Sequence, residues 1–271
     1  MQTNGTRVAL TIAGSDSSGG AGIQADLKTF AALGVYGTSA ITAVTAQSTA
    51  GVVDALILSA DFVTMQMEAV AGDIEIHAVK TGMLGDAAIV EAVAAAIKEL
   101  DLPLLVVDPV LASTSGDELL DDEGVQMMIA ELLPLAHVVT PNVPEAEALS
   151  GMRIASEDSL KEAARRIHAM GAAAVIITGG HWPDTDDRPH DAVIDTLFDG
   201  THFSQFRTPR IDARRTHGTG CTFAAAVAAY LALGHPLADA AERAQQYVAD
   251  AIQHSLLIGA GARLLDHFWH K

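Results

Sequence analysis

One segment combines glycines, threonines and the single cysteine of the chain: Thr216-His-Gly-Thr-Gly-Cys-Thr222. It stands directly before an apolar stretch that predicts a helix. The glycines leave backbone N–H groups free to point at an anion, and a helix N-terminus adds about half a positive charge. We interpret Gly218, Thr219, Gly220 and Cys221 as an anion hole for a phosphoryl group in transfer.

A thiol at a helix N-terminus is expected to have its pKa lowered from the usual value of about 8.5. Cys221 would then be a reactive group beside the anion hole. The alternative is a capped helix with a buried structural cysteine, which is the usual interpretation of a lone cysteine in an apolar context. The glycines and threonines that flank Cys221 favour the functional interpretation.

Hard oxygen ligands follow two apolar runs. Asn142 and Glu145, in Thr140-Pro-Asn-Val-Pro-Glu145, could orient Mg²⁺ and its waters, and Asp108 ends the run 104–107 as a candidate metal or phosphate-side residue. Asn142 brings no charge, so such an ion would be held mostly by water and phosphates. A plain N-cap with an acidic first turn explains Asn142 and Glu145 nearly as well, and Asp108 could equally cap its loop.

A second glycine-rich turn, residues 14–22, lies between a predicted strand and a predicted helix. It lacks the Lys-Ser/Thr end of a phosphate-binding P-loop, and it does not match the Gly-x-Gly-x-x-Gly dinucleotide fingerprint. Its glycines still let backbone approach a ligand closely. A tight strand–helix turn without a ligand is an equally good interpretation.

Basic residues gather at 207–215, where Arg207, Arg210, Arg214 and Arg215 stand in an otherwise acidic chain. They could draw ATP towards the anion hole, but a solvated basic face is the favoured interpretation. The eleven histidines show no metal-ligand spacing such as His-Glu-x-x-His, which argues against zinc.

Composition excludes several classes of protein. With 49% hydrophobic and 18% charged residues over 271 positions, the chain can build a large core, and disorder does not describe it. A net charge of −18 and only 4% aromatic residues argue against a nucleic-acid partner. One cysteine excludes an internal disulfide. The first twenty residues show neither a signal peptide nor a membrane span, so we expect a cytoplasmic protein without a membrane partner.

Short apolar runs alternate with helical patterns along the whole chain. We predict strands at 8–13, 37–46, 52–58, 77–81, 104–107, 138–140, 175–178, 192–198 and 201–206, the last two forming a hairpin. Helices are predicted at 23–33, 61–71, 123–133, 145–149, 156–170, 219–233 and 237–254, and one capped by Asp86 that runs to 100. Residues 181–190 are predicted to be a surface loop or lid.

This alternation predicts a parallel or mostly parallel sheet with helices on both faces. No repeat, linker or break in composition divides the chain, so we expect one domain over residues 1–271. Ligands in such folds bind beyond the carboxyl ends of the strands, where the glycine-rich turns should cluster.

Seven segments together resemble the hydroxymethylpyrimidine/phosphomethylpyrimidine kinases of thiamine biosynthesis. They are residues 11–29, 43–48, 80–84, 107–110, 140–145, 179–181 and 216–222, and the resemblance runs from about residue 8 to 254. It implies a three-layer α/β/α ribokinase-like fold, ATP and Mg²⁺ as cosubstrates, and commonly a homodimer. The implied activity is phosphorylation of 4-amino-5-hydroxymethyl-2-methylpyrimidine by ATP, and then of its monophosphate to the diphosphate.

The resemblance also implies roles for single residues. Gln47 would face the pyrimidine, where its carboxamide offers one acceptor and two donors to a ring nitrogen and the exocyclic amine. The other implied substrate residues are Asp26, Met83, Val110 and Gly14. The implied nucleotide residues are Asn142, Thr178, Gly180 and Thr216, the implied metal residues are Glu145 and Asp108, and Gly218, Thr219, Gly220 and Cys221 match the anion hole.

The chain departs from the family pattern at two places. Many members carry a lysine where this chain has Thr178, and the family's Gly-Pro near the C-terminus is missing from Gly259–Phe268. Some pyridoxine kinases of the lineage also have threonine at the first place, so a pyridoxine or pyridoxal kinase is one alternative. A non-catalytic pyrimidine-binding sensor is another, although a sensor would not need an anion hole.

Overall fold

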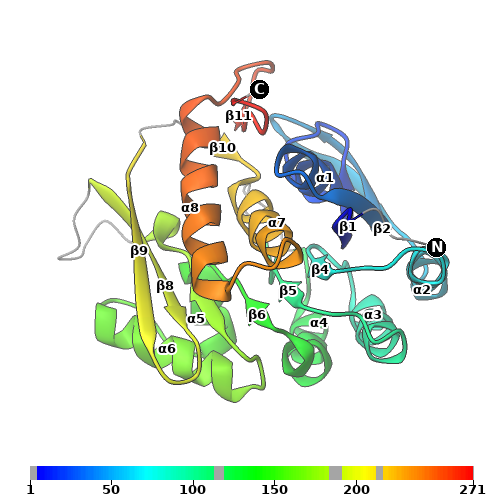
Figure 1. Cartoon of the computed structure of the whole chain (residues 1–271), viewed down its shortest axis with the longest axis horizontal. Coiled ribbons are helices and arrows are strands. Elements are labelled where there is room, and N and C mark those ends of the chain that lie inside the picture. Colours follow the sequence, from blue (N-terminus) through cyan, green and yellow to red (C-terminus); the bar gives the residue numbers. More distant parts are fainter. Residues whose placement is uncertain (1–4, 113–118, 183–190, 212–215, 271) are drawn as a thin grey trace.

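The computed structural model describes residues 5–112, 119–182, 191–211 and 216–270. Their centre is a nine-stranded sheet in the order β3-β2-β1-β4-β5-β6-β7-β8-β9 (Figure 1). The strands are β1 (Val8–Asp16), β2 (Tyr36–Ser48), β3 (Gly51–Ile57), β4 (Ala78–Thr81), β5 (Leu105–Val107), β6 (Val138–Val139), β7 (Val175–Ile177), β8 (Ala192–Phe198) and β9 (Phe203–Pro209). From β2 to β7 all neighbours are parallel, while β3 and β8 run antiparallel to their inner neighbours.

Helices cover both faces of this sheet (Figure 1). One face carries α1 (Gly22–Ala32), α7 (Thr219–Ala232) and α8 (Leu237–Gln253). The other carries α2 (Ala60–Ala71), α3 (Ala87–Glu99), α4 (Asp122–Met127), α5 (Val143–Ser150) and α6 (Glu157–Ala169). The predicted three-layer α/β/α architecture with a mostly parallel sheet is confirmed.

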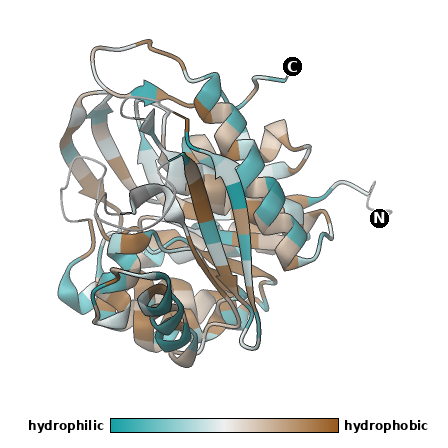
Figure 2. Ribbon diagram, turned by 90° about the vertical axis from the view of Figure 1, so that its left-hand side faces the viewer, coloured by the Kyte–Doolittle hydropathy of each residue, from teal (hydrophilic) through white to brown (hydrophobic). Residues whose placement is uncertain are grey.

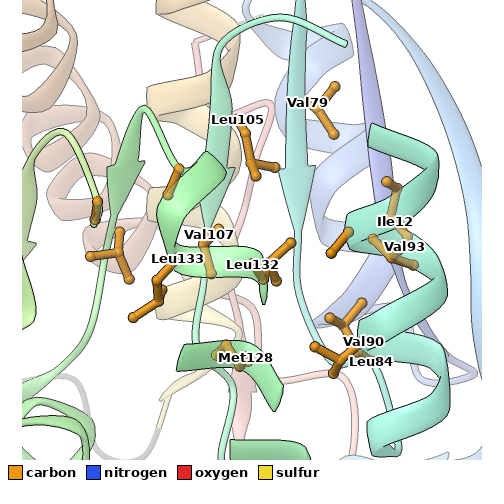
Figure 3. Packing of buried hydrophobic residues seen from close by; sticks show 14 of the residues in the cluster. Ile12, Val79, Leu84, Val90, Val93, Leu105, Val107, Met128, Leu132 and Leu133 are labelled. Carbon is orange, nitrogen blue, oxygen red and sulfur yellow. The ribbon is translucent and has the colours of Figure 1, made fainter. Parts of the chain in front are cut away.

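Two apolar cores hold the layers together, one on each face of the sheet. Alternate residues of β1 separate into them: Leu10 and Ile12 join the core under α2–α6, and Ala9 joins the core under α7. Figure 3 shows Ile12, Val79 and Val107 of the sheet among side chains of α3 and of the segment after α4. In Figure 2 the outer helices carry teal and brown residues side by side, as expected for elements with one buried face.

The helix predicted over 123–133 differs in detail. Its α-helical part ends at Met127, a π-helical turn follows over Met128–Leu132, and a 3₁₀ turn covers Leu133–Leu135. Pro134 in that last turn has no N–H to extend an α-helical ladder. The predicted hairpin β8–β9 is confirmed, whereas residues 183–190 of the predicted lid lie outside the described residues.

A small second sheet ties the C-terminal segment to the anion-hole region. It pairs β10 (Thr216–His217) with β11 (Arg263–Leu264) in parallel. The strand that leads into α7 is therefore paired with a strand of the C-terminal segment. That segment is the one in which the family's Gly-Pro is absent. Among the described residues, we find no helix of the length and apolarity that a bilayer requires.

Candidate active site

The two glycine-rich turns meet at the carboxyl edge of the sheet, as the sequence predicts. A Cβ on Gly218 would collide with the backbone oxygen of Gly20, and a Cβ on Gly20 would lie 2.8 Å from Cδ2 of His217. Gly218 also has a φ of +88°, which L side chains rarely adopt. Glycine is required here for both reasons, and the two turns form one site.

Helix α7 presents its N-terminus to this site. Gly218 is its N-cap residue and supplies no side chain to bond the first N–H groups, and no acidic residue lies in its first turn. A Cβ on Gly220 would meet nothing within 4 Å, so the first turn faces open space. The geometry of Gly218, Thr219 and Gly220 thus suits an anion.

The prediction of a lowered pKa for Cys221 is wrong. Cys221 is partly exposed as a residue. The protein around its thiol nevertheless removes it from water, and this burial raises the pKa of the thiol to about 12. The ammonium of Lys80 opposes the rise, but the carboxylates of Asp108 and Asp26 add to it. Burial therefore outweighs the helix terminus, and Cys221 is a neutral thiol at pH 7 that is hydrogen-bonded to Asp108.

A buried lysine beneath Cys221 is the residue that our sequence interpretation missed. Lys80 on β4 has no exposed surface, and its Nζ lies 2.9 Å from Oδ2 of Asp26 and 3.9 Å from Oδ2 of Asp108. Thr11 donates a hydrogen bond of 2.6 Å to the same Asp26 oxygen. Burial lowers the pKa of Lys80, but Asp26, Cys221 and Asp108 together raise it by more, so its pKa lies above the usual value. A lysine inside the buried strand Ala-Val-Lys-Thr is the signal that could have revealed it.

Asp108 and Glu145 lie close enough for their charges to interact. Burial and then the carboxylate of Asp108 raise the pKa of Glu145 to about 8. Burial also raises the pKa of Asp108 to about 6, against the effect of Lys80. Asp108 Oδ2 is buried and accepts no hydrogen bond from the described residues. Two neighbouring carboxylates with an unused oxygen fit Mg²⁺, which proteins often hold through one or two carboxylates plus substrate phosphates.

Asn142 and Glu145 also form the capping box of α5, which was the alternative prediction for them. Glu145 N–H donates to Asn142 Oδ1, and Asn142 N–H donates to Glu145 Oε2, each over 2.9 Å. The described residues contain no cluster of three His, Cys, Asp or Glu side chains that could hold a metal without help from a ligand. Any ion here would depend on water and phosphate oxygens.

Gln47 lies at the same edge, at the end of β2. Its Nε2 is 3.1 Å from Nε2 of His217, the residue before the anion hole, and that nitrogen is 3.0 Å from Oδ2 of Asp16. Asp26 leaves its Oδ1 buried and without a hydrogen-bond partner among the described residues. Gln47 thus presents its carboxamide at the carboxyl end of β2. Asp26, in contrast, has no exposed surface, and its Oδ2 is bonded to Lys80 and Thr11, so the structure buries this candidate substrate residue.

The remaining substrate candidates lie near the carboxyl ends of neighbouring strands, Gly14 within β1 and Met83 and Val110 in the loops after β4 and β5. Gly14 N–H donates to the Met83 carbonyl over 3.1 Å, and a Cβ on Gly14 would collide with the Met83 methyl group. Val110 follows β5, the strand next to β4. Met83 and Val110 are partly exposed, which suits the apolar walls of a ring slot.

The candidate nucleotide residues Asn142 and Thr178 lie at the ends of β6 and β7, which follow β5 in the sheet. Thr178, at the end of β7, bridges to Asn142 at the end of β6. Arg210 donates to the Gly180 carbonyl over 3.4 Å, so a guanidinium stands next to Gly180, two residues after Thr178. Arg207 instead pairs with the exposed Asp191 over 3.4 Å. Arg214 and Arg215 lie outside the described residues.

Comparison with known proteins also indicates a kinase. The phosphomethylpyrimidine kinase family matches residues 16–266. The chain belongs to this family. It is 49% identical over 263 residues to the hydroxymethylpyrimidine/phosphomethylpyrimidine kinase of Bacillus subtilis, covering 97% of this chain and 95% of that protein. It is 48% identical to a thiamine biosynthesis bifunctional protein of Geobacter sulfurreducens, of which it spans only 51%.

Solved structures of two kinases share the fold of this chain. The phosphomethylpyrimidine kinase of Clostridium difficile superposes with a TM-score of 0.80 at 40% identity, over 91% of this chain and 100% of that one. An ADP complex of Bacillus subtilis pyridoxal kinase superposes with a TM-score of 0.87 at 39% identity, over 97% of each chain. The solved structures similar to this chain thus include a phosphomethylpyrimidine kinase and a pyridoxal kinase, and the pyridoxal kinase structure is an ADP complex.

Proposed function

We propose that this chain transfers phosphate from ATP to 4-amino-5-hydroxymethyl-2-methylpyrimidine, and then to the resulting monophosphate. The observation that carries this proposal is the contact between Gln47 and His217. It places a carboxamide suited to an aminopyrimidine edge beside the first turn of α7, which is suited to a phosphate. The family match and the Bacillus subtilis relative support the same activity.

Catalysis in this proposal rests on positioning and on charge. The transition state of phosphoryl transfer is loose, so donors aimed at the migrating group matter more than a strong base. The N–H groups at the start of α7, around Gly218, Thr219 and Gly220, would hold that group. The open space at Gly220 leaves room for it.

Cys221 then acts as an orienting group. Its thiol stays protonated at pH 7 and donates to Asp108, so the sulfur lone pairs remain available to a substrate hydroxyl. The alcohol of the first acceptor would pass its proton to the Cys221 sulfur while the thiol passes its own proton to Asp108. The alcohol oxygen then takes the phosphoryl group of ATP, and ADP leaves. The second acceptor is a phosphate that is largely ionised at pH 7, because its second pKa is about 6, and it needs no base.

Mg²⁺ is the metal that the family and the donor set imply. Asp108 and Glu145 would hold it, because their carboxylates are neighbours and their proximity raises the pKa of Glu145. When bound, such an ion neutralises charge on the phosphates. Asn142 holds the Glu145 backbone through the capping box, so we propose that it positions the carboxylate and does not bind the ion directly.

The nucleotide would lie across the ends of β6 and β7. Thr178, Gly180, Asn142 and Thr216 are the residues that we assign to it, and the ADP complex of the pyridoxal kinase supports a nucleotide site in this fold. With Thr178 in place of a lysine, Arg210 is the basic side chain of the described residues that stands next to Gly180. We propose that it offsets phosphate charge there.

A pyridoxal kinase is the second candidate, and two observations favour it. The chain has Thr178 at the lysine position, and pyridoxal kinases are among the solved structures with high similarity. The test compares kcat/KM for the aminopyrimidine alcohol with that for pyridoxine and pyridoxal. We expect a preference for the pyrimidine of at least about tenfold, which a single buried hydrogen bond can provide. A preference for the pyridines would support the second candidate.

We also propose a homodimer formed through the edge patch, which comprises Val44, Val53, Leu56, Phe62 and Met65 of β2, β3 and α2. All five side chains are at least 45% exposed. Scattered exposed apolar residues are normal, but a group on one sheet edge and the adjoining helix is typical of a protein interface. A second copy of this chain is the partner that the family resemblance implies.

A further inference from the structure

The contacts of Gln47 determine which end of its carboxamide faces the anion hole. The Nε2 position lies 3.1 Å from His217 Nε2, and the Oε1 position lies 3.1 Å from Thr45 Oγ1. An amide oxygen and an amide nitrogen fit the same space, so the hydrogen atoms on the neighbouring groups decide the orientation. The hydrogen positions on both neighbours, His217 and Thr45, can be assigned from their other contacts.

His217 must carry a hydrogen on Nε2. This nitrogen lies 3.0 Å from Oδ2 of Asp16, a carboxylate that also accepts from the N–H groups of Ser18, Gly20 and Ala21. Burial favours the protonated carboxyl, but the hydrogen bonds from His217, Ser18 and Ala21 lower the pKa of Asp16 to about 2. An ionised oxygen accepts only, so His217 donates to it.

Thr45 must accept from Gln47. Its hydroxyl donates to the Ser15 carbonyl over 2.9 Å, and a hydroxyl has only one hydrogen. A lone pair of Oγ1 therefore faces the amide. Both contacts are satisfied together only when the Gln47 oxygen faces His217 and its NH₂ group faces Thr45. The single hydrogen on His217 Nε2 is then shared between Asp16 Oδ2 and the Gln47 oxygen.

We propose that His217, held by Asp16, is a positioning residue that fixes the Gln47 carboxamide and thereby selects a pyrimidine with an amino group next to its hydroxymethyl group. This inference rests on the proposed function. The Gln47 oxygen has a second lone pair for the substrate amine, and the NH₂ group has a second hydrogen for the adjacent ring nitrogen.

The orientation also places the reacting alcohol. His217 immediately precedes Gly218, the N-cap residue of α7, so the oxygen side of the carboxamide is the anion-hole side. In the substrate, the carbon with the amine is bonded to the carbon with the hydroxymethyl group. An amine bound beside His217 therefore directs the hydroxymethyl group towards Gly220 and Cys221. The opposite amide orientation would direct it away.

The test measures the selectivity ratio, which is kcat/KM for the aminopyrimidine alcohol divided by kcat/KM for the same alcohol without the amine. We expect His217→Phe, which keeps a ring but removes the donor, to lower this ratio about tenfold. His217→Gln keeps an N–H donor and should retain most of the ratio. His202→Phe, at an exposed hairpin position, is the matched control and should leave it unchanged.

A double-variant cycle separates this role from a merely structural one. Gln47→Met should lower the ratio about as much as His217→Phe, and the combined variant should lower it no further, because His217 acts through Gln47. If His217→Phe does not fold by circular dichroism, His217→Ala takes its place in the cycle. An unchanged ratio in the folded variant, or additive losses, would overturn this inference alone. A wild-type enzyme that phosphorylates neither alcohol would overturn the proposed function, and this inference with it.

Discussion

Cys221 shows that the chemistry of a residue depends on its neighbours more than on its motif. The motif predicts a thiol with a lowered pKa, because a helix N-terminus favours the thiolate. Burial and the carboxylates of Asp108 and Asp26 raise the pKa instead. Those carboxylates belong to α1 and to the loop after β5, more than a hundred residues away in the sequence, so the local pattern contains no sign of them.

A neutral thiol predicts unequal effects on the two phosphorylations. Cys221→Ala should slow phosphorylation of the alcohol by about tenfold to a hundredfold, and phosphorylation of the monophosphate by less than about threefold. Single-turnover measurements with each acceptor give both numbers. Cys221→Ser, which can still donate to Asp108, is the matched control and should retain more of the first step. Equal losses on the two acceptors would contradict an orienting role at the alcohol.

We expect the loss of the Lys80 ammonium to destabilise the folded protein strongly. Lys80→Met leaves Asp26 as a buried carboxylate without its cation, which typically costs about 3–5 kcal/mol in the free energy of unfolding. The matched control is Lys98→Met, which removes an exposed ion pair with Glu131 and should cost at most about 1 kcal/mol.

Urea denaturation of both lysine variants provides the comparison. Adding Asp26→Asn to Lys80→Met should recover part of the lost free energy, since the uncompensated charge is then gone. Equal costs for the two single variants would show that the buried pair is not held as we describe.

At the scale of the elements, most strands and helices could be predicted, because apolar runs and caps are local signals. Asp86 caps α3 through its side chain, as expected. The hairpin of β8 and β9 could also be predicted, although residues 199–202 join the two strands and not 199–200 alone. The order of the strands could not be predicted, nor could the antiparallel direction of β3 and β8, because both depend on contacts between distant segments. The meeting of the two glycine-rich turns could be predicted, because the loops that follow parallel strands gather at the same edge of the sheet.

Asp195 on β8 supports the nucleotide side of the site and predicts a pH dependence of stability. It is buried, and its Oδ1 accepts from Gly179 N–H over 2.8 Å. Burial raises its pKa from 3.8 to about 6 against the hydrogen bonds from Gly179 and Gln245. The folded state thus binds the proton more tightly than the unfolded state, and stability falls as the pH rises through this window.

Asp195→Asn isolates this contribution, since an asparagine oxygen can still accept from Gly179. Relative to that variant, the wild type should lose about 2 kcal/mol of unfolding free energy between about pH 4 and pH 7. Urea denaturation across this range is the measurement, with Asp73→Asn as the matched change at an exposed carboxylate. A constant difference between wild type and Asp195→Asn would contradict the raised pKa.

At the scale of the whole molecule, the edge patch predicts a dimer. We expect the wild type to sediment as a dimer and the Val53→Glu/Leu56→Glu variant as a monomer, because two buried carboxylates would oppose association. Leu257→Glu places the same charge at another exposed apolar position and should leave the dimer intact. Sedimentation velocity distinguishes the two states, and a monomeric wild type at micromolar concentration would contradict the proposal.

The proposed function requires a two-step kinase reaction at the first turn of α7. The most direct measurement is ³¹P NMR of the purified chain with ATP, Mg²⁺ and the aminopyrimidine alcohol. We predict that ADP forms together with the pyrimidine monophosphate, whose signal then gives way to that of the diphosphate. Formation of ADP and free phosphate with no phosphorylated pyrimidine would contradict it.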